Sequence, residues 1–557
     1  MANTDSSHAN FPYVERDISW LYFNHRILQE AMRPDVPPLE RLSFLGIYSN
    51  NLDEYYRVRV ATISRLAEMT GRGVRDERHR ARELYARVSD IDRRLSEEFA
   101  AANTNIRHVL ADNGIHIIDE SNLNDEQQHF VRCMFRSKIS GFVSPVWLSK
   151  ISEFSSESDS HIYLAVQLTA PDLPTDYALI ELPTSTCGRF VKIPSGDGSI
   201  SVMYLDDVVR FCLPMIFPGI GYTGFEAYSF KFTRDAEMEV DNDLHVGTMD
   251  KIAKAVKSRR NGAALRVLHD HEMPRELLSL LMKKLKVDAL DSVQPTARYQ
   301  NHKDFMQFPA ECRKDLKYRA WPPAVPQELK GTDSLMQLIT EKDRFIQVPY
   351  QTFDYIVRLL QEAAVSKNVK SIKISLYRLA RNSKIVEALK CAARNGKKVT
   401  AVVELLARFD EQSNIHYARE LQEAGVHVVF GLEGLKIHSK IININVKNGK
   451  DIAVVGTGNF HEGNAKVYTD YFLMTANPVI VKEVAQVFSV IKRPFEQQKF
   501  KNLLVSPFNM REEFYRLIDS EIANARRGKE AWIKIKINHI TDVELVSHLY
   551  EASQAGV

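Results

Sequence analysis

The feature that most restricts the fold is an alternation of strand-like and helix-like segments in the second half of the chain. Short runs rich in Val, Ile and Leu alternate with longer segments in which apolar residues recur at helical spacing. Units of this length form a sheet of parallel neighbouring strands with helices on its faces. We therefore predict a mostly parallel sheet with functional side chains at its strand ends. The expected strands and helices are, in chain order, 369–377, 383–396, 397–406, 414–425 and 426–430.

At 557 residues the chain is several times longer than one domain, so it should form several units with separate cores. A helical first part is followed by a mixed part, with strands at 162–168 and 177–182 and helices at 250–260 and 275–287. The stretch RAWPPAVPQELK then carries three prolines in five residues, which suits a linker. We predict a multidomain α/β and α+β fold. Its parts are a helical domain at 1–112, an α+β head domain at 113–324, a first C-terminal α/β domain at 325–505 and the start of a second at 506–557.

The end of the chain repeats a pattern that occurs twice before it. Gly396 and Gly425 each follow a predicted helix and precede a strand, as expected for glycine just after a helix. Gly556 follows the last helix in the same way without a strand behind it, which would leave an unpaired strand edge. We expect that the sequence ends inside the second α/β domain. The remaining elements are expected as strands at 439–446, 451–458 and 532–538 and helices at 479–492, 510–526 and 541–553.

The overall charge excludes a protein that binds polyanions over its whole surface. There are 74 Lys and Arg against 71 Asp and Glu, a net charge of +3, so nucleic acid and acidic lipid are not attracted globally. No apolar run reaches the length of a bilayer span, and the first residues lack the features of a signal peptide. The five cysteines are scattered, as is typical of free thiols in a reducing compartment. We expect a cytoplasmic protein with local anion sites, no nucleic-acid partner and no indication of membrane association.

The densest cluster of reactive side chains lies in LKIHSKIININVKNGKDIAVVGTGNF. His438 and Lys440 alternate there, so a strand would place both on one side. Asn459 ends the turn GTGN that follows the next strand. Common phosphate-binding and nucleophile motifs, GxxxxGK[ST], GxGxxG and GxSxG, are missing. A His-x-Lys strand with a G[ST]xN turn resembles one half of the phospholipase D type of site, in which the imidazole attacks phosphorus while Lys and Asn hold phosphoryl oxygens.

Elementary chemistry supports phosphoryl transfer at this cluster. A histidine with a pKa near 6.5 is largely neutral at pH 7, so a ring nitrogen keeps a lone pair for attack on phosphorus. Fixed cations stabilise the charge on the three phosphoryl oxygens. Lys436 lies beside the histidine, and Arg378 and Arg408 follow predicted strands. Taken singly, each arginine could be a surface charge and the histidine a hydrogen-bonded core residue, so spacing alone leaves these alternatives open.

Longer stretches resemble the bacterial polyphosphate kinases of the first type along nearly the whole chain. They include LSFLGIYSNNLDEYYRVRV, YSFKFTRDAEMEV, KISLYRLARNSKI, VVELLARFDEQSNIHYARELQEAGVHV, GLKIHSK and GTGNFHEGNAKVYTDY, in the family's order. The resemblance implies a helical domain, a head domain and two C-terminal domains that each look like half of a phospholipase D. It also implies reversible transfer of the terminal phosphate of ATP to inorganic polyphosphate through a phosphohistidine, with Mg²⁺, in a homodimer or homotetramer.

The same resemblance assigns roles to single residues. His438 would be the phosphorylated nucleophile, Lys440 and Asn459 would act beside it, and Lys436 would bind phosphate. Asn51 and Tyr468 would contact ATP, although Asn51 has an alternative as a helix cap or Asx turn. Arg378 and Arg408 match the magnesium and phosphate site. Because arginine has no lone pair to give to a metal, we interpret both as phosphate clamps beside magnesium.

Two rival functions follow from the expected incomplete domain. The family's second half-site supplies an Arg and a second His, and neither His539 nor His548 stands in a matching motif. A truncated relative that binds ATP or polyphosphate without turnover is therefore the alternative to an active polyphosphate kinase. A nuclease or lipase of the phospholipase D type is disfavoured, because one half-site is missing and the N-terminal motifs match the kinases.

Overall fold

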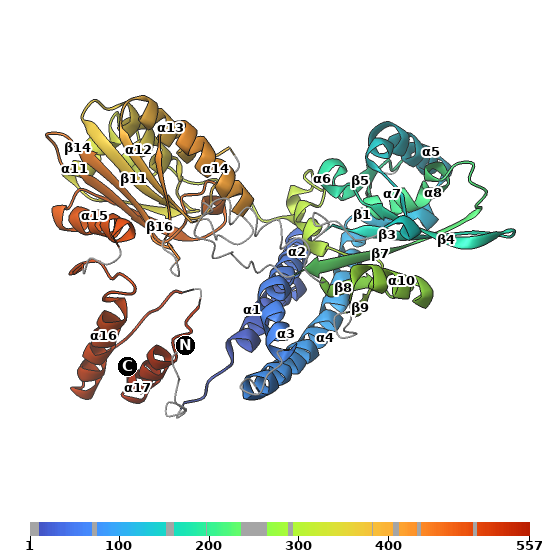
Figure 1. Ribbon diagram of the computed structural model, residues 1–557, viewed down its shortest axis with the longest axis horizontal. Helices are drawn as coiled ribbons and strands as arrows, with labels where there is room; N and C mark the ends of the chain where they lie inside the picture. Colours follow the sequence, from blue (N-terminus) through green and yellow to red (C-terminus); the bar gives the residue numbers. More distant parts are fainter. Residues whose placement is uncertain are drawn as a thin grey trace. The chain divides into compact units, whose positions relative to one another are not determined.

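The computed structural model forms two compact units, which are described separately (Figure 1). One comprises Val14–Glu239 with Lys257–Arg319, and the other consists mainly of Ala320–Val557. The mixed α/β and α+β fold class is confirmed, whereas the four domain boundaries stay predictions. The structure describes residues 11–68, 75–151, 161–196, 198–234, 264–287, 293–380, 382–404, 411–431, 436–493, 498–537 and 539–557.

The first unit begins with helices, as predicted. They are α1 (Arg16–Met32), α2 (Pro38–Tyr55), α3 (Ala61–Glu68) and α4 (Arg75–Asp112), and Figure 1 shows α1, α2 and α4 side by side. Their apolar faces share one core, in which Leu21, Leu42 and Ile106 are fully buried. Each helix buries one apolar stripe, which explains why the spacing of apolar residues predicted these helices.

The rest of this unit is built on two sheets. A small sheet has the order β1 (Ile115–Ile118), β6 (Ile200–Tyr204) and β5 (Phe190–Ile193), and the strands of a six-stranded sheet are, in order, β2 (Val146–Trp147), β4 (Leu173–Glu181), β3 (Tyr163–Ala170), β7 (Gly224–Arg234), β8 (Ala264–Asp270) and β9 (Val293–Thr296). Helix α10 (Arg275–Leu285) packs on the larger sheet. The strands predicted at 162–168 and 177–182 and the helix at 275–287 are confirmed. The helix expected at 250–260 lies outside the described residues.

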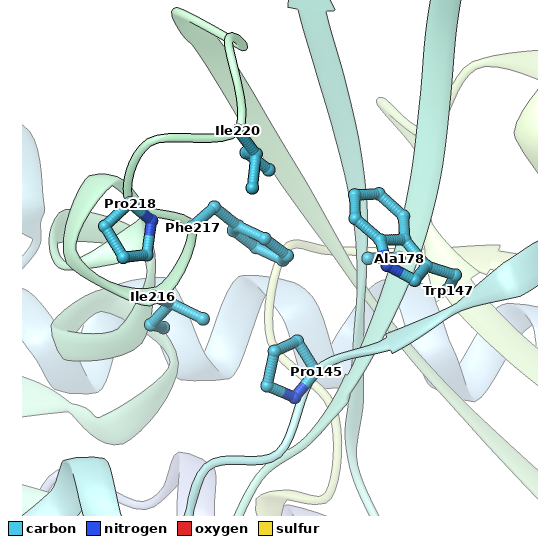
Figure 2. Close-up of a pocket in the computed structure, with 7 residues that line it drawn as sticks. All are labelled: Pro145, Trp147, Ala178, Ile216, Phe217, Pro218 and Ile220. Carbon is cyan, nitrogen blue, oxygen red and sulfur yellow. The ribbon is translucent and has the colours of Figure 1, made fainter.

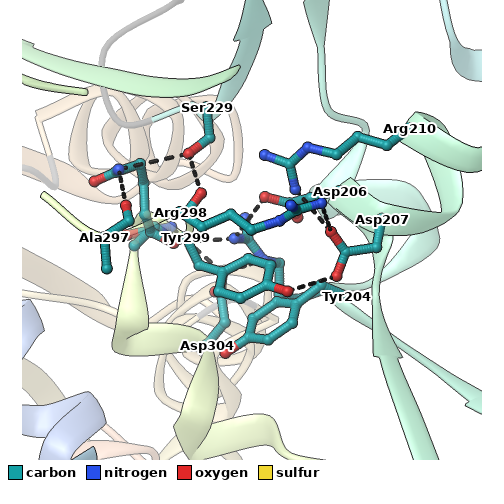
Figure 3. A network of polar contacts seen from close by, with 12 residues as sticks. Tyr204, Asp206, Asp207, Arg210, Ser229, Ala297, Arg298, Tyr299 and Asp304 are labelled. Atoms are coloured by element: carbon teal, nitrogen blue, oxygen red, sulfur yellow. Dashed lines mark hydrogen bonds and ion pairs between the residues drawn. The ribbon is translucent and has the colours of Figure 1, made fainter. Parts of the chain in front are cut away.

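A buried polar network holds the middle of this unit together (Figure 3). The carboxylate of Asp207 is fully buried, accepts a hydrogen bond from the Tyr299 hydroxyl at 2.8 Å and pairs with Arg210 at 2.7 Å. Arg298 lies 3.3 Å from the same carboxylate. A buried charge is tolerated when partners surround it in this way, so we assign this network to structure.

The second unit contains a seven-stranded sheet that corrects one prediction. Strands β11 (Val369–Leu376), β12 (Lys398–Val403) and β13 (His427–Phe430) are parallel, but the other four neighbouring pairs are antiparallel. The sheet is therefore mixed rather than mostly parallel. The crossovers through helices α13 (Lys384–Arg394) and α14 (Glu411–Glu423) make parallel pairs. A short turn joins β14 (Lys440–Val446) to β15 (Ile452–Gly456) and forces an antiparallel hairpin. The strands are, in sheet order, β10 (Arg344–Val348), β16 (Asp470–Thr475), β15 (Ile452–Gly456), β14 (Lys440–Val446), β11 (Val369–Leu376), β12 (Lys398–Val403) and β13 (His427–Phe430).

Helices cover both faces of this sheet. Figure 1 shows α12 (Asp354–Val365) and α13 (Lys384–Arg394) on one side and α15 (Pro478–Lys492) on the other, and α14 (Glu411–Glu423) connects β12 to β13. As predicted, Gly396 and Gly425 end α13 and α14 with φ of 75° and 88°, a backbone conformation that strains other residues. The predicted strands and helices at 369–377, 383–396, 397–406, 414–425, 426–430, 439–446, 451–458 and 479–492 are confirmed as elements.

The last part of the chain contains two helices and no described strand. Helices α16 (Met510–Arg526) and α17 (Val543–Gln554) pack on a small cluster that includes Ile518, Ile522 and Ala552. The strand predicted at 532–538 is wrong for 532–537, the part that the structure describes, because no described strand lies beside it to complete a ladder. None of the helices in the described part of the chain combines the length and apolar composition of a bilayer span.

Candidate active site

His438 and Lys440 lie at the start of β14, and both contact one aromatic ring. His438 is in the extended segment before the strand, not on the strand as predicted, because β14 begins at Lys440. The Tyr377 ring meets the imidazole edge-on with the ring centroids 5.1 Å apart, and Lys440 Nζ is 5.4 Å from the Tyr377 centroid. Lys440 Nζ also donates to the His438 carbonyl oxygen. The structure thus brings this pair together through Tyr377, which follows β11 and which we did not predict from the sequence.

The backbone on both sides of His438 is tied to neighbouring strands. Ser375 Oγ donates to the Ser439 carbonyl oxygen at 2.7 Å and accepts from the Ile441 amide at 3.0 Å. The Glu404 carboxylate, which follows β12 and is 4% exposed, accepts from the Ile437 amide at 2.9 Å. These bonds fix the path of the chain through His438 from both directions.

A buried asparagine joins the two strand ends that carry these contacts. Asn414, on α14, is 1% exposed and its Nδ2 donates to the carbonyl oxygens of Tyr377 and Glu404, both at 2.8 Å. Its amide therefore holds the end of β11 against the end of β12. Sequence reasoning missed Glu404 and Asn414, although a polar residue directly after an apolar strand was a usable signal.

The electrostatics favour a neutral imidazole beside a cation. Burial lowers the pKa of His438, and the charges of Lys440 and Lys436 lower it further. Burial lowers the pKa of Lys440 to about 8, while Asp470 opposes this shift. At pH 7 the histidine therefore keeps a lone pair and Lys440 keeps its charge. This combination can receive a phosphoryl group and hold its oxygens.

The turn after β15 depends on the close approach of its glycines to β16. A Cβ on Gly458 would lie 2.3 Å from Asp470 Oδ2, and one on Gly456 would lie 2.6 Å from the Phe472 ring. Thr457 Oγ1 donates to Asp470 Oδ1 at 2.8 Å and fixes the turn. Asn459 follows, and its Oδ1 is buried without a hydrogen-bond partner among the described residues. This oxygen can accept a hydrogen bond from a ligand, whereas a phosphoryl oxygen would need a donor, which is the Nδ2 group of the same side chain.

Glu462 connects this turn to the start of α13. Its Oε1 accepts from the Lys384 amide at 2.7 Å, the Ile385 amide at 3.3 Å and Ser383 Oγ at 3.1 Å. The carboxylate therefore caps a helix N-terminus and also interacts favourably with the helix dipole. Because Arg378 lies in the loop that leads from β11 to α13, Glu462 links the loop of Arg378 to the turn of Asn459.

We expect Glu462→Ala to lower the free energy of unfolding by about 1–2 kcal/mol, since it removes a capping side chain. Urea denaturation followed by circular dichroism would measure this change. Glu462→Gln keeps an acceptor oxygen and should lose less. A stability equal to that of the natural chain in Glu462→Ala would contradict the capping role.

The other predicted site residues are placed as follows. Arg378 is half-buried two residues after β11, Lys436 is exposed two residues before His438, and Tyr468 is 60% exposed before β16. Asn51 belongs to the other unit, where its Nδ2 donates to Asn24 Oδ1 at 3.3 Å. Because Asn51 lies inside α2, its alternative as a helix cap is wrong. Arg408 lies outside the described residues.

The residues near His438 fit magnesium carried on phosphates rather than held by the protein. Among the described residues no group of three or more His, Cys, Asp or Glu side chains is arranged to hold a metal. The carboxylates of Glu404, Glu462 and Asp470 already accept protein hydrogen bonds. Magnesium commonly keeps several waters and binds through nucleotide phosphates, so this donor set is compatible with it.

A pocket in the other unit has a different character. It has a volume of about 120 Å³, and Figure 2 shows that Phe217, Trp147 and Ile220 point into it. Its remaining lining residues are Pro145, Ala178, Ile216 and Pro218. None of these lining side chains can act as a nucleophile, an acid or a base, so this pocket offers no groups for phosphoryl transfer.

Comparisons with known proteins agree with the sequence resemblance. The polyphosphate kinase N-terminal, middle and C-terminal domains 1 and 2 match residues 13–118, 126–308, 334–497 and 503–557. Polyphosphate kinases of Vibrio parahaemolyticus and Escherichia coli are 40% and 38% identical over 98% of this chain, which spans 79% and 80% of theirs. The crystal structure of polyphosphate kinase from Porphyromonas gingivalis matches with a TM-score of 0.81 and 32% identity, over 99% of this chain and 80% of that one. The chain therefore belongs to the polyphosphate kinase family.

Proposed function

We propose that this protein transfers the terminal phosphate of ATP to inorganic polyphosphate, reversibly, and that His438 carries the phosphoryl group between them. The observation that carries the proposal is the pairing of a histidine and a cationic lysine on the Tyr377 ring. Family membership supports the substrates, because the relatives are named polyphosphate kinases. The geometry supports the nucleophile, because neighbouring strands hold the backbone on both sides of His438.

The reaction proceeds in two balanced steps. A ring nitrogen of His438 attacks the γ-phosphorus, a P–N bond forms, and the bond to the β–γ bridging oxygen breaks with its electron pair leaving on ADP. A terminal oxygen of the polyphosphate chain then attacks the same phosphorus, and the P–N electron pair returns to the imidazole. Lys440, Lys436, Arg378 and Asn459 hold phosphoryl oxygens during both steps, and Arg408 has the same proposed role.

The remaining assignments complete the proposal. Asn51 and Tyr468 contact the nucleotide, and the exposed Tyr468 ring can stack on a base. Magnesium, bound to the phosphates, would neutralise part of their charge. Residues Arg378 and Arg408 act as phosphate clamps beside it. We further propose a cytoplasmic homo-oligomer, a dimer or tetramer, as the resemblance implies.

Incubation of the chain with γ-labelled ATP tests the function. We expect label on the protein that is stable in base and labile in acid, followed by its transfer to added polyphosphate. Label without transfer would indicate a protein that completes only the first step. ATP binding without any label would favour the relative that binds without turnover and would overturn the proposal.

The pH profile should report Lys440. Its folded-state pKa of about 8 lies below the usual value of 10.5, so the ammonium loses its charge as the pH rises through about 8. We expect kcat/KM to fall above that pH, because the phosphoryl group loses a cation. Lys440→Arg should move this fall to higher pH, since arginine stays charged. The acid limb should lie below pH 6.5, where the lowered pKa of His438 places it.

Initial rates between pH 5 and 10 for the natural chain and for Lys440→Arg would check this assignment. Lys436→Arg is the matched control, because Lys436 is exposed and its replacement should leave the alkaline limb in place. An alkaline limb that is identical in Lys440→Arg and the natural chain would remove Lys440 from the reaction.

A further inference from the structure

The sheet of the second unit has a polar region beside the core that α15 covers. Ile441 and Ala453 pack against Val484 and Phe488 of α15, so this face of β14 and β15 is apolar at that point. Two residues further along β14, Asn443 lies on the same face. Asn443 stands directly opposite Lys373 of β11, which in turn stands opposite Thr400 of β12. The apolar core is therefore continued by a polar row across three strands.

Three lysines converge on this row. Lys373 is half-buried, Lys398 stands opposite Ser371 on β12, and Lys492 ends α15. Burial lowers the pKa of Lys373, and the charges of Lys398 and Lys492 lower it further, as expected for like charges that lie close together. Over the described parts of the chain, none of the three has a carboxylate partner. Like charges held together without an acid favour the binding of an anion.

A buried amide points to the same conclusion. Asn443 is 5% exposed, and its Nδ2 has no hydrogen-bond partner among the described residues. A buried donor without a partner is unfavourable, so this amide favours a ligand that brings an acceptor oxygen beside Lys373. The neighbouring carboxylate of Asp451 does not supply it, because its oxygens accept from Asn445 Nδ2 at 2.8 Å and the Val446 amide at 2.7 Å.

We propose that Lys373, Lys398, Lys492 and Asn443 form a second phosphate-chain site, here called the lysine patch. Lysine ammonium groups and an amide N–H are donors that match phosphate oxygens. The patch contains no aromatic side chain, so it lacks the stacking surface with which proteins bind single-stranded nucleic acid. The choice of an inorganic phosphate chain as the ligand rests on the proposed function, whereas the anion site itself rests on the residues of the patch.

The patch lies on the middle of β11 and β14, whereas His438 lies where β14 begins. A polyphosphate chain bound at the lysine patch would keep its end near His438, since its contact with the site of His438 would then be made within one complex. The gain in affinity from the lysine patch should therefore grow with the length of the polyphosphate chain. Orthophosphate, which cannot reach both places, should gain nothing from it.

The double variant Lys373→Gln/Lys398→Gln tests the lysine patch in the full chain. The matched control is Lys367→Gln/Lys482→Gln, which removes the same charge from two exposed lysines, one lying two residues before β11 and one on α15. Equilibrium binding of linear polyphosphate of defined length, without ATP, is measured at several salt concentrations. We expect the patch variant to bind about tenfold more weakly, with a salt slope reduced by about two, and the control to change by less than about twofold.

Further variants and ligands test binding at the lysine patch separately from the phosphorylation of His438. Asn443→Asp places a carboxylate opposite Lys373 and should weaken binding as well. Label from ATP on His438 should persist in the patch variant, whereas His438→Ala should lose label and keep patch-dependent binding. Equal polyphosphate affinity of the patch variant and its control, with both folded by circular dichroism, would overturn the proposal. Equal patch-dependent binding of orthophosphate or of a single-stranded oligonucleotide would overturn the ligand class.

Discussion

Replacing His438 with alanine should reduce polyphosphate formation from ATP by about 10⁴-fold or more, because removing a nucleophile blocks the covalent path. Lys440 and Lys436 would still attract phosphates, but neither replaces the imidazole on the Tyr377 ring. ATP binding should change much less than turnover. The rate of polyphosphate formation and the label retained on the protein from γ-labelled ATP measure the two parts of this expectation.

A second histidine nearby supplies the control. His461 Nδ1 accepts hydrogen bonds from the amides of Gly463 at 3.0 Å and Asn464 at 3.1 Å. The side-chain oxygen of asparagine can accept the same bonds, so His461→Asn should retain this turn contact and keep activity within about threefold. Label that persists in His438→Ala, or label that disappears only in His461→Asn, would move the nucleophile away from His438.

The fold was predictable where local patterns act alone. The helices of the first unit and the β–α alternation of the second follow from the spacing of apolar residues, and Gly396 and Gly425 mark helix ends because they adopt positive φ. Strand direction was not predictable in the same way. Alternation indicated parallel pairs, but the short connection between β14 and β15 imposes the antiparallel pairing of Ile442 with Val454.

The candidate site was predictable only in its reactive groups. His438, Lys440 and Asn459 could be proposed because phosphoryl transfer needs a nucleophile and donors to the phosphoryl oxygens, which their side chains can supply. Their supports were missed. Glu404 carried a signal as a polar residue after an apolar strand, but its partner is a backbone amide, and Asn414 on α14 binds two carbonyl oxygens. Every residue has a backbone carbonyl and nearly every one an amide, so the type of the partner residue does not reveal such a hydrogen bond. The alternation in WIKIKIN predicted a strand wrongly for a different reason. A strand also needs a partner strand for its backbone hydrogen bonds, and the alternating pattern does not show whether one is present.

Gly458→Ala should disable the site without touching a reactive group. The added Cβ would lie 2.3 Å from Asp470 Oδ2, 2.4 Å from its Cγ and 2.7 Å from its Cβ. Rotation of the Asp470 side chain relieves the first two contacts but not the third, because that Cβ is fixed to β16. We expect turnover to fall about a hundredfold as Asn459 is displaced, and stability to fall by about 1–3 kcal/mol, as in other overpacked sites.

Enzymatic rates and urea denaturation of Gly458→Ala can be compared with Gly141→Ala, where an added Cβ meets nothing within 4 Å and little should change. Asp470→Gly in the Gly458→Ala background removes all three clashing atoms but also the Thr457 hydrogen bond that fixes the turn, so it should restore only part of the activity. Asp470→Ala loses the same hydrogen bond and keeps the clashing Cβ, so it should restore less. The Asp470 variants should also change the pH dependence of the rate. Asp470 raises the pKa of Lys440 against the effect of burial, so replacing Asp470 should move the alkaline fall in rate to lower pH. Recovery that is equal for Asp470→Gly and Asp470→Ala would show that the Cβ contact is not what makes glycine necessary at this position.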